Sequence, residues 1–142
     1  MKVFFDTNVL VSAFTTRGLS ADLMRLVIAR HELVTGEVNL TEFRRVLRDR
    51  FKMPASAIHA LEQQLRQHTV IARPATPSDH RIRDPDDAWV LASAMAGGAD
   101  ILVTGDKDLL TIAEAVSLPV LDPRACWDRL RRTRSSGQHS EE

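Results

Sequence analysis

Two aspartates, Asp6 and Asp106, each follow a short apolar run at a point where a strand should end. Asp6 comes directly after Val3-Phe4-Phe5, and Asp106 follows Ile101-Leu102-Val103-Thr104 and one glycine. A carboxylate is rarely buried unless it is paired, so its place at the end of a buried strand marks a candidate site. In open parallel sheets, ligands bind outside the carboxyl ends of the strands. We therefore expect both aspartates at one edge of a sheet.

Three more aspartates stand at a predicted helix start, in the order Asp84-Pro85-Asp86-Asp87. Asp84 is expected to cap this helix, with the proline at the first helical position. Asp87 falls at the third position, where a carboxylate also interacts favourably with the helix dipole. Asp106 could likewise cap the helix after it, and Asp108 is explained by first-turn charge. The residues alone leave open which of these acids does chemistry.

An acidic cluster of this kind predicts a hard divalent cation. Two unit charges about 4 Å apart repel by about 4 kcal/mol at an effective dielectric constant near 20, so the cluster needs a cation or a raised pKa. Cys126 is the only cysteine, and the five histidines show no metal-ligand spacing. Carboxylates without thiolate or paired imidazole suit Mg²⁺ or Mn²⁺ rather than Zn²⁺.

Strand and helix patterns alternate along the chain, which predicts an α/β fold: a three-layer α/β/α sandwich with a central, mostly parallel sheet. Thr7 or Asn8 is expected to cap a short helix to about residue 14, and Ser20 to cap the next. The apolar spacing then predicts, in chain order, a strand at 32–35, a helix at 37–49, a helix after Pro54, a weak strand at 70–71, a helix from Asp84-Pro85 to Gly97-Gly98, a strand at 101–104, a short helix at 109–115, a strand at 119–121 and a helix from Asp122-Pro123 to about Arg132.

The chain has the size and composition of one globular domain. It has 142 residues, 44% hydrophobic and 27% charged, with a formal net charge of zero. We expect a single domain over residues 1–132 and a disordered polar tail over 133–142. No apolar run approaches the roughly 20 residues that span a bilayer, so we expect a cytoplasmic protein. The charge balance gives no argument for nucleic acid, although clustered arginines could neutralise phosphates. Trp89 and Trp127 are expected in the core.

Four sequence blocks in order resemble the PIN domain, named from the PilT N-terminus. The resemblance covers about residues 1–122 and is nearest to stand-alone PIN proteins classed as toxins of bacterial type II toxin–antitoxin pairs, the VapC-like ribonucleases. The blocks are Phe4-Phe5-Asp6-Thr7-Asn8-Val9-Leu10, Glu42-Phe43-Arg44-Arg45-Val46-Leu47, Asp84-Pro85-Asp86-Asp87 leading to Val90-Leu91-Ala92-Ser93-Ala94, and Leu102-Val103-Thr104-Gly105-Asp106-Lys107-Asp108-Leu109-Leu110.

The resemblance implies a ribonuclease dependent on Mg²⁺ or Mn²⁺. The family's acids fall on Asp6, Glu42, Asp87 and Asp106, which are the implied catalytic residues. Asp6, Asp87 and Asp106 would bind metal, with Glu42 bound directly or through water. The third position is the least fixed, since Asp84 and Asp86 stand beside Asp87. The remaining assignments are support by Asn8 and Thr104, weaker site candidates Asp84 and Asp108, and RNA contacts from Arg44, Arg45, Arg48 and Lys107.

The same resemblance implies three kinds of partner. They are an RNA substrate, a cognate antitoxin that covers the groove, and further copies of the chain in a homodimer or larger homo-oligomer. The residues themselves show none of them.

Two other functions fit parts of the pattern. Haloacid-dehalogenase-like phosphatases also begin with an apolar strand that ends in an aspartate, which would make Asp6 a nucleophile. Those enzymes normally carry a general acid and base aspartate where this chain has Asn8, and an amide cannot transfer the proton. The second alternative is a PIN-like binding module that has lost catalysis. The presence of all four acids argues against that loss.

Overall fold

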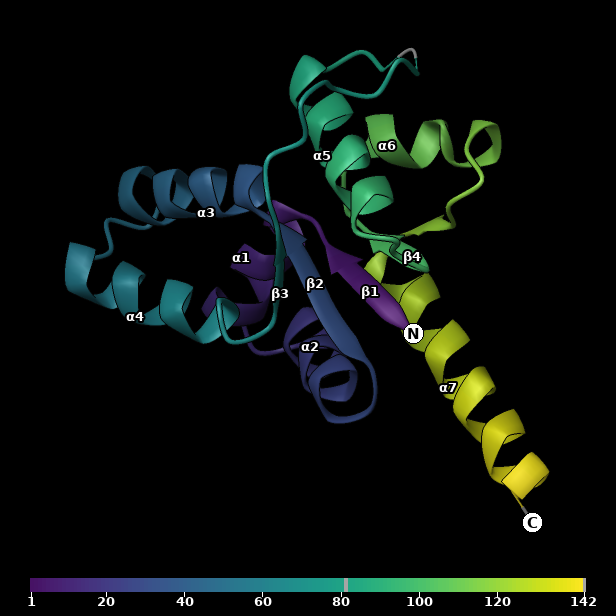
Figure 1. Ribbon diagram of the computed structural model, residues 1–142. Helices are drawn as coiled ribbons and strands as arrows, with labels where there is room; N and C mark the ends of the chain where they lie inside the picture. The colour runs from purple at the N-terminus through teal and green to yellow at the C-terminus, as the bar shows by residue number, and fades with distance from the viewer. Residues whose placement is uncertain (81, 142) are drawn as a thin grey trace.

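A single five-stranded sheet forms the centre of the protein (Figure 1). The computed structural model describes residues 1–80 and 82–141, and the side chains of those residues up to 132. The strands are β1 (Lys2–Phe5), β2 (Glu32–Gly36), β3 (Thr69–Ile71), β4 (Ile101–Val103) and β5 (Val120–Leu121). Their order is β3-β2-β1-β4-β5, and every pairing between them is parallel. The predicted α/β/α sandwich is confirmed, with a sheet that is wholly parallel over the described residues.

Strand β1 supplies side chains to both faces of the sheet. Val3 and Phe5 belong to one hydrophobic core, and Phe4 belongs to the other. All three are fully buried, which accounts for an uninterrupted apolar run in place of an alternating pattern. Asp6 stands directly after this central strand.

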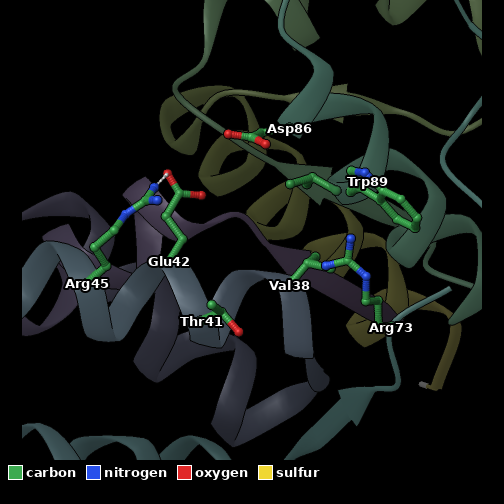
Figure 2. A pocket seen from close by; sticks show the side chains of 8 residues that line it. Val38, Thr41, Glu42, Arg45, Arg73, Asp86 and Trp89 are labelled. Atoms are coloured by element: carbon green, nitrogen blue, oxygen red, sulfur yellow. Dashed lines mark ion pairs between the residues drawn. The ribbon is translucent and has the colours of Figure 1, made fainter.

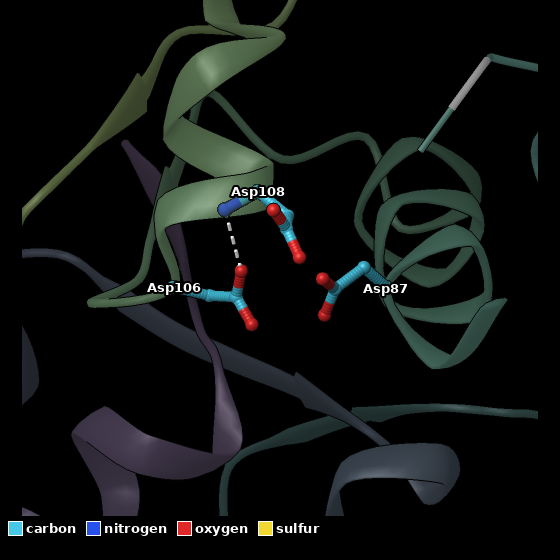
Figure 3. Close-up of side chains that lie close together, drawn as sticks. All are labelled: Asp87, Asp106 and Asp108. Atoms are coloured by element: carbon cyan, nitrogen blue, oxygen red, sulfur yellow. Dashed lines mark hydrogen bonds between the residues drawn. The ribbon is translucent and has the colours of Figure 1, made fainter. Parts of the chain in front are cut away.

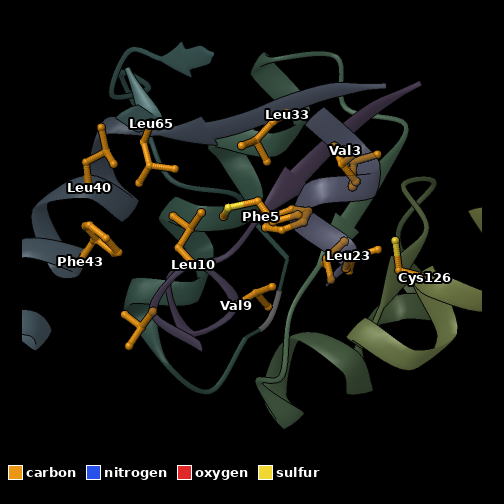
Figure 4. Close-up of a cluster of buried hydrophobic side chains, with 14 of the residues drawn as sticks. Val3, Phe5, Val9, Leu10, Leu23, Leu33, Leu40, Phe43, Leu65 and Cys126 are labelled. Carbon is orange, nitrogen blue, oxygen red and sulfur yellow. The ribbon is translucent and has the colours of Figure 1, made fainter. Parts of the chain in front are cut away.

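The helices divide between the two cores. Helices α1 (Thr7–Thr15), α2 (Leu19–Arg30), α3 (Glu37–Asp49), α4 (Ala55–Leu65) and α7 (Pro123–Glu141) place buried residues in the larger core (Figure 4). Helices α5 (Pro85–Ala96) and α6 (Lys107–Thr111) contribute to the smaller core on the opposite face, and a short 3-10 turn at Ala113–Ala115 packs beside it. The site lies where α1, α3, α5 and α6 begin.

Two predicted helix caps are wrong. The cap of α1 is Asp6, whose carboxylate accepts a hydrogen bond from the Thr7 backbone N–H, in place of Thr7 or Asn8. The cap of α2 is Gly18, and Ser20 lies buried inside the first turn. In both cases the helix begins before the polar residue that was expected to cap it.

The bounds of α3 match the prediction, and α5 begins at Pro85 as predicted, with Asp84 as its cap. Helix α7 is longer than expected, because its backbone continues to Glu141 instead of ending near Arg132. The expectation that residues 133–142 form a disordered polar tail stays a prediction, because the side chains of these residues lie outside the described part of the structure. None of the described helices has the length and apolar character to cross a membrane.

Candidate active site

Asp6 and Asp106 lie at the same edge of the sheet. Strands β1 and β4 are parallel neighbours in which Phe5 pairs with Val103, so the residues after each strand leave the sheet side by side. The Asp6 backbone N–H donates to the Val103 carbonyl over 3.0 Å, which continues the pairing by one residue. The sequence prediction that these two acids share one sheet edge is confirmed.

The Asp6 carboxylate is buried and held on both oxygens. Asp6 is only 5% exposed. Oδ1 accepts hydrogen bonds from the Thr7 backbone N–H at 2.7 Å and from Asn39 Nδ2 at 3.1 Å. Oδ2 accepts one from the Thr104 hydroxyl at 2.6 Å. The carboxylate is therefore fixed in orientation by three different elements.

Burial raises the pKa of Asp6 to about 6. The hydrogen bonds from Thr104 and Thr7 oppose this rise, and the nearby charges of Glu42 and Asp106 add to it. No basic side chain of the described residues is among the causes of this shift. Asp6 thus titrates in a range where a bound positive charge would convert it to the ionised form.

Asp87, Asp106 and Asp108 form the densest part of the site (Figure 3). One carboxylate oxygen of each lies within 4.8 Å of the others. Asp106 comes from the end of β4 and caps α6, where its Oδ1 accepts from the backbone N–H groups of Asp108 at 2.8 Å and Leu109 at 3.4 Å. Asp87 faces this pair from the first turn of α5.

Asp87 is the least satisfied acid of the group. It is 6% exposed, and its Oδ2 is buried with no hydrogen-bond partner among the described residues. Burial is the largest of the causes that together raise its pKa to about 8, and the charges of Asp106, Asp6 and Asp84 contribute to the same rise. An unpaired buried carboxylate oxygen is costly unless it binds a cation or a proton.

Glu42 reaches the site from α3. Its carboxylate is among the charges that raise the pKa of Asp6, and its Oε1 lies 3.9 Å from Nη2 of Arg45 (Figure 2). The side chain is 38% exposed and borders a cleft between α3 and α5. Glu42 therefore stands at the open side of the acidic group, where it can reach an ion directly or through a water molecule.

Thr104 and Asn8 tie the two strand ends together. The Thr104 hydroxyl donates to the Asp6 carboxylate and accepts from the Asp106 backbone N–H at 2.9 Å. A single side-chain oxygen therefore links the side chain of Asp6 to the backbone of Asp106. Asn8 Oδ1 accepts from the Gly105 backbone N–H at 3.2 Å. Both side chains act on the geometry of the loop that carries Asp106.

Asn39 is a site residue that the sequence did not indicate. It is fully buried in the first turn of α3 and donates to both the Asp6 carboxylate and the Thr7 hydroxyl. An amide three residues before Glu42 has no motif of its own. The only signal was an asparagine beside Leu40 on the buried face of an amphipathic helix.

The neighbouring aspartates divide between capping and the cluster. Asp84 caps α5 by accepting from the Asp86 backbone N–H at 2.9 Å, as predicted, and Asp86 is exposed at the cleft. Asp87 is the member of this trio that joins Asp106. Asp108 also lies within the cluster, and its Oδ2 is 3.5 Å from Nε of Arg83.

The four residues predicted to contact RNA lie in different surroundings. Arg44 donates to Glu62 of α4 at 2.8 Å, and Arg48 donates to its neighbour Asp49 at 2.7 Å. Arg45 is exposed at the cleft beside Glu42, and Lys107 is exposed in the first turn of α6. Of the four, Arg45 is therefore paired with an acid of the candidate site, Glu42, and Lys107 directly follows another, Asp106.

The residues present fit a hard divalent cation. Every donor in the group is a carboxylate oxygen, and Asp87 offers one that no described side chain uses. Among the described residues, no basic side chain forms an ion pair with Asp6, Asp87 or Asp106, while Asp108 alone has Arg83. The group is therefore a cluster of carboxylates at the edge of the sheet that could hold such an ion.

A family model described as the PIN domain matches residues 2–108. The chain belongs to the PIN domain family. The matched span contains all four acids of the predicted site, from Asp6 to Asp106. No curated protein shows a significant match to this PIN domain.

Solved structures support the fold of this PIN domain. VapBC2 from Rickettsia felis, bound to a promoter DNA fragment, aligns with a TM-score of 0.60 at 14% identity over 84% of this chain and 97% of that one. VapBC-1 from nontypeable Haemophilus influenzae gives 0.60 at 17% identity over 87% and 99%. VapC20 of Mycobacterium tuberculosis, described as a toxin that cleaves the sarcin–ricin loop, gives 0.54 at 18% identity over 77% and 93%.

Proposed function

We propose that this PIN domain is a metal-dependent endoribonuclease that acts as the toxin of a toxin–antitoxin pair. The observation that carries the proposal is the buried, unpartnered Oδ2 of Asp87 beside Asp106, in a group without a cation of its own. Mg²⁺ or Mn²⁺ suits such an all-oxygen donor set. Membership of the PIN family supports nuclease chemistry at this site.

The four acids have two roles in the proposal. Asp6, Asp87 and Asp106 would hold the ion, and Glu42 would bind it directly or through water. A divalent ion in such a site lowers the pKa of a bound water and stabilises negative charge on the phosphodiester.

The supporting side chains act through Asp6 and Asp106. Thr104 and Asn39 fix the Asp6 carboxylate by donating to different oxygens, so it cannot rotate away from the pocket. Asn8 restrains Gly105 immediately before Asp106. These three residues keep the acids in place before any ligand arrives, which favours tight positioning of the reacting groups.

The partners in the proposal are RNA, a cognate antitoxin and further copies of this chain, in the cytoplasm where RNA is available. The names of the structural neighbours support the first two, since two of them are VapBC assemblies and the third is an RNA-cleaving toxin.

Cleavage of defined RNAs by the purified protein, with Mn²⁺, Mg²⁺ or EDTA, tests the proposal. We expect cleavage with either metal, none with EDTA, and a loss of at least about 100-fold in the Asp6→Asn variant. The matched control is Asp22→Asn, because Asp22 is a surface acid on α2 paired with Arg25. Full activity of Asp6→Asn in a preparation free of contaminating nuclease would contradict the proposal, and RNA binding without cleavage would favour a binding module.

A further inference from the structure

A cleft between α3 and α5 opens directly beside the acidic group (Figure 2). Its volume is about 180 Å³. Glu42 belongs both to the cleft and to the candidate active site, and Asp86 on its other wall precedes Asp87 in the chain. A strand of RNA with a phosphate at the acids would therefore place a neighbouring nucleotide in this cleft.

The inner wall of the cleft is an aromatic ring with a guanidinium against it. Cζ of Arg73 lies 4.1 Å from the centroid of the Trp89 ring. Trp89 is only half-buried and belongs to neither hydrophobic core, which corrects the expectation that it would be a core residue. Val38 and Val90 complete an apolar floor. Aromatic rings and arginine planes are the surfaces on which unpaired bases stack.

The rim of the cleft carries hydrogen-bonding groups of both kinds. Asp86 is an exposed acceptor, the Thr41 hydroxyl donates to the Glu37 carbonyl and can accept from a ligand, and Arg45 and Arg73 are exposed cations. An apolar floor with a few polar groups around it is the usual composition of a small-ligand site. The cations suit the phosphates that flank a base, and the carboxylate suits an exocyclic amino group.

We propose that this cleft binds one unpaired nucleobase of the RNA substrate, next to the phosphate held at the acidic group. The Trp89–Arg73 pair supplies the stacking surface, and Asp86 accepts from an exocyclic amino group of the base. The inference rests on the proposed ribonuclease function and adds a binding site for the nucleotide next to the cut, which must be unpaired to enter it. A paired base cannot enter, because its edge and faces are already occupied.

The fluorescence emission of Trp89 is the readout for this test. A Trp127→Phe variant leaves Trp89 as the only tryptophan of the chain. We expect nucleoside 5′-monophosphates, added in EDTA, to change its emission saturably. We expect Arg73→Ala to weaken that binding by about 10-fold, the scale of one stacking contact. CMP should bind more tightly than UMP, which lacks the amino group, and Asp86→Asn should remove the difference.

Arg25→Ala is the matched control, since Arg25 is an exposed arginine on α2 outside the cleft and pairs with Asp22. It should leave nucleotide binding unchanged. If Trp127→Phe fails to fold, the two indole N–H signals of the wild-type protein in a ¹⁵N–¹H spectrum replace the fluorescence, with a Trp89→Phe variant to assign them.

An unresponsive Trp89 at millimolar nucleotide would overturn the inference, and so would an equal response to inorganic phosphate alone. Equal binding of CMP and UMP would overturn the role of Asp86. Because binding is measured without metal, its failure is separate from that of the proposed function. If the protein cleaves RNA but Trp89 does not respond to nucleotides, only the base-binding role of the cleft is contradicted. If nucleotides bind but RNA is not cleaved, only the ribonuclease function is contradicted.

Discussion

Two groups of buried carboxylates in this protein have opposite electrostatic surroundings. Glu62 on α4 is 8% exposed and accepts from Arg44 at 2.8 Å and from Arg66 at 2.9 Å. Burial would raise the pKa of Glu62, but the hydrogen bonds from the two arginines lower it below its ordinary value. Burial also raises the pKa of Asp6 and Asp87, and no arginine reverses it there.

Under the proposed function, this difference separates a structural acid from an acid that would bind a ligand. Arg66 also pairs with Glu37 at 2.6 Å, so the arginines join α3 to α4 in a network that is neutralised within the chain. Within the described part of the chain Asp6 and Asp87 have no such partner, and the charge of Asp106 contributes to the raised pKa of both. Burial alone does not distinguish the two groups, whereas the source of the neutralising charge does.

The sharpest test of this difference compares catalysis in two amide variants. We expect Asp106→Asn to lose at least about 100-fold in RNA cleavage, because a carboxylate that holds the ion is removed. Glu62→Gln should remain within about threefold of wild type, since its partners are arginines away from the sheet edge. Initial rates with Mn²⁺ on one RNA measure both. A large loss in Glu62→Gln, with its fold intact by circular dichroism, would erase the distinction.

The same chemical change should alter stability in opposite directions. Glu62→Gln leaves two partly exposed arginines without their carboxylate, so we expect the free energy of unfolding to fall by roughly 1–2 kcal/mol. Asp87→Asn removes a charge that is costly to bury, and we expect the metal-free protein at pH 8 to gain roughly 1–3 kcal/mol. Urea unfolding in EDTA measures both. A loss of stability in Asp87→Asn would show that Asp87 is already compensated without metal.

Stability of the metal-free protein should fall as pH rises from about 4 to 8. The folded-state pKa of Asp6 is about 6 and that of Asp87 about 8, both above the unfolded value of 3.8, so the folded state binds more protons in this window. We expect at least about 1 kcal/mol less stability at pH 8 than at pH 5. Added Mn²⁺ should increase the free energy of unfolding more at pH 8 than at pH 5. A flat profile in EDTA would argue that these acids ionise normally.

The smallest expected effect comes from Asn39. An Asn39→Leu variant removes a donor from Asp6 Oδ1, which should raise the pKa of Asp6 above about 6. Metal-dependent cleavage should then fall by roughly threefold near pH 6.5 and recover near pH 8. The control is Gln63→Leu, the same change at an exposed amide on α4. An equal loss at both pH values would instead indicate a structural defect.

The sequence predicted the elements well where local chemistry determines them. Helix α5 follows from Asp84-Pro85, and α3 follows from apolar residues at helical spacing. Caps were harder to predict, because several polar residues stand near each helix start and only the path of the chain selects one. Asp6 was taken as a strand end, and it is also the cap of α1.

The site was predictable in part. The acids that follow β1 and β4 stand out because a charge after a buried strand is unusual. Asn39 and the Glu62 network depend on contacts between α3 and residues far away in the sequence, for which no local pattern exists. Trp89 was assigned to the core because a tryptophan on a helix is usually buried, but its neighbour Arg73 holds it at a cleft.

Asp6 and Asp106 each begin a helix as well as border the acidic group, since they cap α1 and α6. Because both aspartates also cap helices, their caps limit which substitutions are tolerated at positions 6 and 106 once selection for catalysis ends. Replacement by alanine would cost about 1 kcal/mol at each cap, whereas asparagine or serine would keep the helix start. A relative of this chain that has lost its activity should therefore carry asparagine or serine at positions 6 and 106, and its ancestry would remain visible in those short polar side chains.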